Sequence, residues 1–246
     1  MIAWKLFKHA FGMLWRNLGS ALKISLIPFA VIMTVFGLFF GTMVAGAGPY
    51  GPAAPPTGGM FAMIVVGIVC GTAIAVNWHR FVLLNEPAGW VPRLHGVRII
   101  AYLLQLVLIG LLLGGGFGIA SVVASLLMTG GGAVALLGAI LMLALRVFAL
   151  AAYWRLGASL PGAALDDGAG IGETWRATKG NLGTFVVLAL ILFGFAIAIG
   201  VVQMLAMFVP LIGILIYLAV EWFLGMLGLS LLTTVYGYYV EKRELV

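Results

Sequence analysis

The chain has 246 residues, of which 64% are hydrophobic and only 8% are charged. Because a water-soluble domain carries about 25% charged residues, this composition excludes a mainly soluble protein and predicts one solvated by lipid. The net charge of +6 does not indicate a nucleic-acid partner, since the basic residues lie at the ends of apolar segments rather than on one aqueous face.

The first 23 residues predict an amphipathic helix that lies in the membrane interface. Along residues 1–23, basic and small side chains recur in steps of three and four, and apolar side chains follow the same period on the other side. The basic positions are Lys5, Lys8, Arg16 and Lys23, and the apolar ones include Phe7, Phe11, Leu14 and Leu18. This helix either anchors the topology of the chain or docks to anionic lipid or a partner.

Six apolar segments follow and predict an all-α integral membrane bundle over residues 24–246. We expect transmembrane helices at residues 24–46, 60–84, 99–128, 130–157, 183–208 and 211–240. Each has about 20 residues or more, which is enough to cross ~30 Å of hydrocarbon. The Pro/Gly-rich loop at 47–59, the short TGGG turn and Pro210 join them into three antiparallel hairpins.

The distribution of charge predicts the orientation. Every lysine and arginine except Arg146 lies before the first span, after an even span or after the last, and the opposite loops contain none. Under the positive-inside rule, both termini are cytosolic.

A weak threefold repeat accompanies the three hairpins. The segments WRNLG, PRLHG and TKGNLG precede the odd spans, and aromatic and basic residues end the even ones. This pattern indicates either a triplicated hairpin or the general preference of a cytosolic interface for Trp, Tyr, Arg and Lys. Within the third span, Gly110, Gly114 and Gly118 are expected to form a close-packing face.

Two ionisable residues lie inside apolar segments. Arg146 is in the fourth span and Glu221 in the sixth. Counted from the outer ends of their helices, their depths differ by about 7 Å, so the two side chains can meet if the helices are neighbours. We expect an ion pair that fixes the helix register, with a substrate, lipid-headgroup or proton site as the alternative.

Other polar residues lie near the membrane-spanning segments. Gln105, Gln203 and Asn77 outline a polar track with the pair, or form hydrogen bonds between helices. His79, Arg80 and Arg155 end the even spans and, with the basic residues of the first helix, are predicted to contact lipid headgroups. No two histidines or cysteines share ligand spacing and Cys70 stands alone, so we expect neither a metal site nor another cofactor.

The motifs NWHRFVLLNEP, RLGASLPGAAL and ETWRATKGNL resemble a group of bacterial six-span inner-membrane proteins. That group is distantly similar to YciC-like proteins and to the membrane domain fused to some glycerophosphodiester phosphodiesterases. The resemblance implies the same six-helix plan in a bacterial plasma membrane. It carries over no phosphodiesterase activity, because the catalytic domain is not part of this sequence.

The sequence therefore predicts a non-catalytic multi-pass membrane protein. It acts in membrane organisation or as an accessory subunit, and its partners are anionic lipid headgroups on the cytosolic side or other integral membrane proteins. The alternative is a transporter or permease for a small anion or lipid that uses Arg146 and Glu221. A membrane enzyme would need clustered acids, bases or a nucleophile, and only Asp166, Asp167 and Glu173 come near this.

Overall fold

The computed structural model describes residues 1–46 and 57–245, and this part of the chain is all-helical. The predicted loop at 47–59 lies almost wholly outside the described residues. The helices are α1 (Ile2–Arg16), α2 (Leu18–Ala45), α3 (Thr57–Leu84), α4 (Gly96–Met128), α5 (Gly132–Gly157), α6 (Leu160–Ala164), α7 (Ile171–Ala177), α8 (Leu182–Ala206) and α9 (Pro210–Tyr239).

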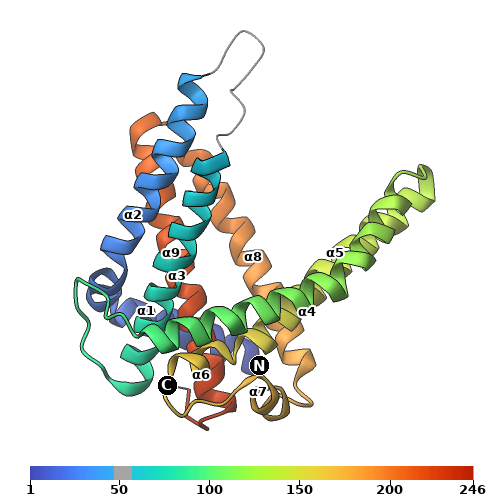
Figure 1. The fold of residues 1–246 in the computed structure, drawn as a ribbon. Helices are drawn as coiled ribbons and strands as arrows, with labels where there is room; N and C mark the ends of the chain where they lie inside the picture. Colours follow the sequence, from blue (N-terminus) through green and yellow to red (C-terminus); the bar gives the residue numbers. More distant parts are fainter. Residues whose placement is uncertain (47–56, 246) are drawn as a thin grey trace.

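Six of these helices are long and apolar enough to cross a membrane: α2, α3, α4, α5, α8 and α9. Consecutive spans pack on each other as the hairpins α2–α3, α4–α5 and α8–α9, so the predicted fold class is confirmed. The α4–α5 turn uses Gly131 and Gly132 at φ of 71° and 49°, a backbone region that glycine enters without strain. Figure 1 shows both termini at one end of the molecule.

The N-terminal helix differs from the prediction in length and in its surroundings. It ends at Arg16, because Asn17 leaves the helical conformation and the chain turns into α2. Lys23 therefore belongs to the first turns of α2. Most of the apolar face of α1 is buried against α8 and α9, with Leu6, Ala10 and Leu14 fully enclosed, while Phe7 and Phe11 also line a groove.

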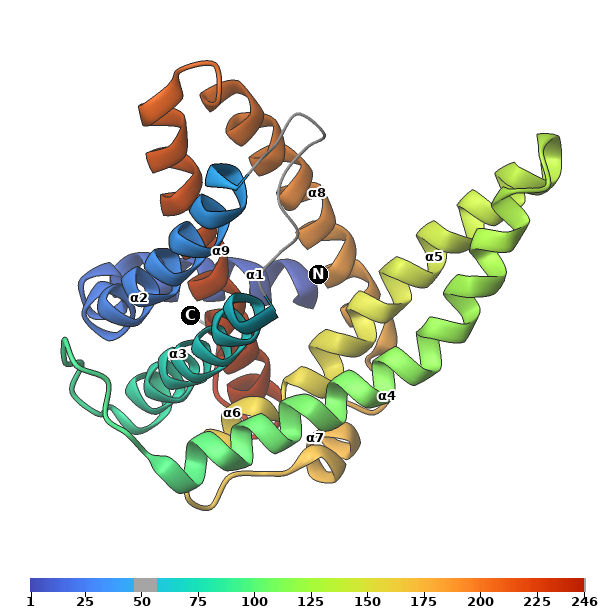
Figure 2. The same ribbon diagram turned by 45° about the horizontal axis from the view of Figure 1, so that its top comes forward.

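The packed core lies at the end of the bundle that holds the termini. Its largest enclosed side chains include Trp78, Phe185, Leu14 and Leu231, from four different helices. The α4–α5 hairpin leans away from the other spans toward its turn (Figures 1 and 2). The chain therefore combines one tight end with an open, divergent end.

The glycines of α4 do not form the expected close-packing face. A Cβ atom at Gly110, Gly114 or Gly118 would meet nothing within 4 Å. The close approach uses Gly138 of α5 instead, where a Cβ would lie 2.7 Å from the Met128 backbone nitrogen and 2.8 Å from the Ala124 oxygen. The prediction was wrong because a glycine stripe does not specify which neighbour, if any, packs against it.

Candidate functional site

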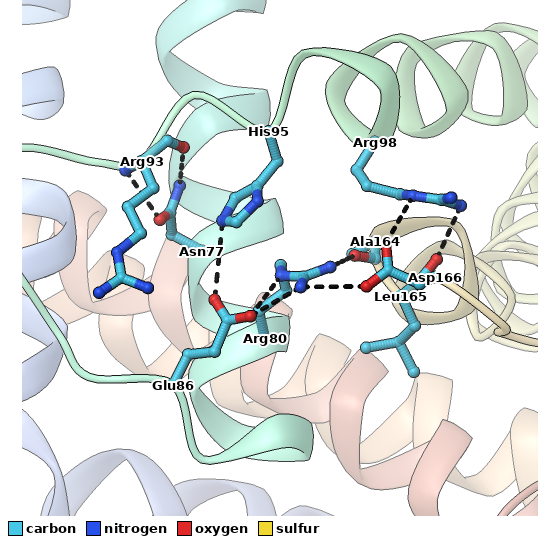
Figure 3. Close-up of polar contacts among 9 residues, drawn as sticks. All are labelled: Asn77, Arg80, Glu86, Arg93, His95, Arg98, Ala164, Leu165 and Asp166. Atoms are coloured by element: carbon cyan, nitrogen blue, oxygen red, sulfur yellow. Dashed lines mark hydrogen bonds and ion pairs between the residues drawn. The ribbon is translucent and has the colours of Figure 1, made fainter.

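The densest group of charged side chains lies at the packed end of the bundle, around Arg80 (Figure 3). Arg80 is in the last two turns of α3, and Asn85, at a φ of 55°, ends that helix by reversing the chain. Glu86 is thereby brought back beside Arg80. Asp166 follows α6, and Arg98 is in the first turn of α4.

The guanidinium of Arg80 makes four hydrogen bonds. Its Nε and Nη2 donate to Glu86 Oε1 at 2.9 and 2.6 Å, and Nη2 also donates to Asp166 Oδ2 at 3.2 Å. Its Nη1 donates to the backbone oxygen of Ala164 at 3.0 Å. The side chain is only 9% exposed. Arg80 is thus a buried cation with two carboxylates, not a lipid-headgroup contact as predicted.

Two further residues extend this cluster. Arg98 Nε lies 3.1 Å from Asp166 Oδ1, and its Nη1 donates to the Leu165 backbone oxygen at 2.9 Å. His95 Nε2 lies 3.6 Å from Glu86 Oε2. The cluster therefore ties together the end of α3, the loop that enters α4 and the loop after α6.

This arrangement shifts the pKa values of the two carboxylates. The hydrogen bonds from Arg80 hold the pKa of Glu86 below its usual value, and they do the same for the pKa of Asp166. Both groups therefore stay ionised at neutral pH, and each positive charge is matched. These ion pairs and hydrogen bonds connect three separate segments of the chain and stabilise this end of the bundle.

His79 lies beside this cluster and, like Arg80, is not the lipid-headgroup contact that was predicted. Its side chain is fully buried, with Nδ1 2.8 Å from Thr233 Oγ1 on α9 and Nε2 3.4 Å from the Tyr102 hydroxyl on α4. It therefore links three helices and cannot reach a lipid headgroup. The prediction failed because a residue near the end of an apolar segment can still be buried by neighbouring helices in the folded protein.

Arg146 and Glu221 do not form the predicted ion pair. Arg146 is exposed on α5, and no ion pair or hydrogen bond of its side chain occurs within the described part of the chain. Glu221 is exposed on α9 and accepts a hydrogen bond from Gln203 Nε2 at 3.1 Å. The physical reason is the divergence of the α4–α5 hairpin, which places α5 against α8 rather than α9 (Figure 2).

The predicted polar track is not continuous. Asn77 exchanges two 3.1 Å hydrogen bonds with the backbone of Arg93, Gln105 donates to the Ser159 hydroxyl, and Gln203 binds Glu221. Of these three separate contacts, only the Gln203–Glu221 bond joins two helices, as the alternative predicted. Asn77 in particular fastens the 85–95 loop to α3.

The remaining predicted headgroup contacts lie on the surface. Lys5, Lys8, Arg16 and Lys23 are all exposed. Arg155 is half-buried: its guanidinium lies 3.5 Å above the Trp175 ring and donates to Thr178 Oγ1 and to the Trp175 backbone oxygen. It therefore holds α7 against the end of α5.

Glu86 was missed as a site residue, and Asp166 was considered only with Asp167 and Glu173 as a weak candidate for an enzymatic site. A signal was present, since Glu86 and Asp166 are the acids nearest to the ends of apolar segments that also carry arginines. Among the described residues, no three His, Cys, Asp or Glu side chains lie close enough to hold a metal ion.

Comparisons of the chain with protein families, with curated proteins and with solved structures find no match.

Proposed function

We propose that this is a non-catalytic accessory protein of a bacterial inner membrane, with cytosolic termini, whose α4–α5 hairpin contacts another integral membrane protein. The observation that carries the proposal is Arg146, a cation on the exposed surface of a hairpin that leans away from the bundle (Figure 1). The assignment to a bacterial inner membrane rests on the resemblance of three sequence motifs to six-span inner-membrane proteins.

The position of Arg146 explains why lipid is an unsuitable neighbour. It lies eleven residues, about 16 Å along the helix, from the nearer end of α5. An arginine in hydrocarbon costs several kcal/mol unless a carboxylate, a carbonyl or water compensates it. A partner helix that brings such a group would stabilise the contact and fix its register.

The surface of the α4–α5 hairpin suits helix packing. Leu104 and Leu111 of α4 and Leu136 of α5 are each more than 60% exposed, and the open glycines of α4 lie on the same hairpin. Small residues permit close approach between helices in lipid, where apolar surface alone gives no driving force. The hairpin therefore allows a partner helix to pack closely and to form one buried polar interaction with Arg146.

The alternative, a transporter built on an Arg146–Glu221 pair, has lost its main support. The two side chains are not paired, and the amides of the supposed track bind separate local partners. No observation in the described residues favours it.

A photo-crosslinking experiment tests the proposal. Leu143 precedes Arg146 by three residues and is 51% exposed, so it lies on nearly the same face of α5. We expect p-benzoylphenylalanine at position 143 to give a discrete protein adduct in living cells. Arg146→Gln should remove that adduct, whereas Arg176→Gln, which removes an exposed charge elsewhere, should not. Adducts with lipid alone would refute the proposal.

A further inference from the structure

We propose that a groove along α1 binds one anionic phospholipid, with its phosphate beside Lys5, Lys8 and Arg16 and an acyl chain along Phe7, Phe11 and Phe195. It rests on the proposed function only in the premise that the chain binds membrane components. The site is far from the α4–α5 turn, so either idea can fail alone.

The groove has a volume of about 670 Å³ and combines two kinds of side chain. This volume is within the ~300–1,000 Å³ of typical ligand sites. Three cations line it, and no carboxylate occurs among its described lining residues. Its lining residues are Trp4, Lys5, Phe7, Lys8, His9, Phe11, Gly12, Arg16, Phe195 and Leu245.

The three cations form one stripe on α1 at spacings of three and eight residues. Each is exposed, and no hydrogen bond or ion pair of these side chains occurs among the described residues. Gly12 shapes the stripe: a Cβ there would lie 3.2 Å from Arg16 Nη1, so the guanidinium folds back along the helix over the glycine. Three positive charges thus lie along one side of α1, with no carboxylate among the described lining residues of the groove.

The aromatic side forms a fixed apolar wall. Phe7 stacks on Trp4 with centroids 5.5 Å apart and meets Phe195 of α8 edge-on at 5.4 Å. Phe11 meets Phe223 of α9 edge-on at 5.6 Å. Phe195 lies thirteen residues into α8, about 20 Å along that helix, so the wall includes a side chain from the middle of a candidate membrane span.

An anionic phospholipid matches both halves of the groove. A soluble anion would satisfy the cations but leave the aromatic wall bare, and a zwitterionic lipid would place its own cation beside three others. A lipid with a net negative head compensates the charge and buries a chain against the phenylalanines. We therefore assign the groove to phosphatidylglycerol-like lipids.

Native mass spectrometry of the detergent-solubilised full chain tests the assignment, with phosphatidylglycerol and phosphatidylcholine as probes. We expect one phosphatidylglycerol to be retained in preference to phosphatidylcholine. The Lys5→Gln/Lys8→Gln variant should retain it at least about tenfold less well, since each basic residue near a charged surface contributes about 1 kcal/mol. Millimolar inorganic phosphate should not displace the lipid.

Matched controls make the outcome decisive. Arg176→Gln/Lys179→Gln removes the same charge from exposed positions outside the groove and should leave retention unchanged. Gly12→Leu should weaken binding without a change in charge. Equal loss in both double variants, or equal retention of the two lipids, would overturn the assignment. Arg146→Gln should have no effect, which separates this result from the hairpin proposal.

Discussion

Arg80 is the residue on which the packed end of the molecule depends most. It is a single buried cation that bonds two carboxylates and a backbone oxygen from separate segments. We expect Arg80→Gln to lower the free energy of unfolding by about 3 kcal/mol, because removal of one partner leaves Glu86 with an uncompensated charge. Thermal unfolding in detergent measures this loss. Arg93→Gln removes an exposed guanidinium from the loop between α3 and α4, and its effect should stay within about 0.5 kcal/mol. Equal effects of the two changes would contradict the role of Arg80.

The same cluster predicts sensitivity to acid. Because the folded-state pKa values of Glu86 and Asp166 lie below their ordinary values, their stabilising effect is present above the unfolded pKa values, about 4.3 for Glu and 3.9 for Asp. It is lost as the pH falls through the folded values. We expect the melting temperature to fall below about pH 4, and to fall less steeply in Arg80→Gln. An identical acid profile in that variant would show that other groups dominate.

At the scale of helices, Gly138 is the position at which α5 closely approaches the backbone of α4 within the hairpin. A Cβ atom at this position would collide with the backbone of α4, which cannot move without opening the hairpin. We expect Gly138→Ala to destabilise the protein by about 1–3 kcal/mol. Gly114→Ala, where a Cβ meets open space, should change stability by no more than about 0.5 kcal/mol. Circular dichroism during thermal unfolding compares them, and the reverse order would mean that α4 packs through its glycine stripe.

The relation between α5 and α9 can be tested with a double-mutant cycle. Arg146 and Glu221 share no hydrogen bond or ion pair, so Arg146→Gln and Glu221→Gln should have independent effects. We expect the double variant to equal the sum of the single variants within about 0.5 kcal/mol in detergent unfolding. A coupling energy above 1 kcal/mol would show that the hairpin closes and that the pair forms.

The sequence predicted the helices and their pairing into hairpins well, but it predicted the contacts between different hairpins poorly. Apolar length alone predicts a span, because each backbone polar group in hydrocarbon must be bonded within its own helix. Which helix faces which depends on shape, and periodicity does not report shape. Arg146 and Glu221 had compatible depths but lie on diverging helices, whereas Arg80 and Glu86 are six residues apart and meet through a turn that Asn85 creates.

For the whole molecule, the tight end with both termini and the open end define two sides, and charge predicts which side is cytosolic. Twelve of the 13 lysines and arginines lie at the end that holds the termini. Segments rich in these residues are translocated across the membrane unfavourably. Lys242 and Thr129 are exposed at opposite ends of the molecule. In a Cys70→Ala background, we expect a membrane-impermeant maleimide to label Thr129→Cys in intact spheroplasts and Lys242→Cys only after permeabilisation. The background variant should stay unlabelled. The opposite pattern would place the α1 groove in the outer leaflet and the hairpin turn in the cytosol, so it would invert the side on which each proposed partner must be sought.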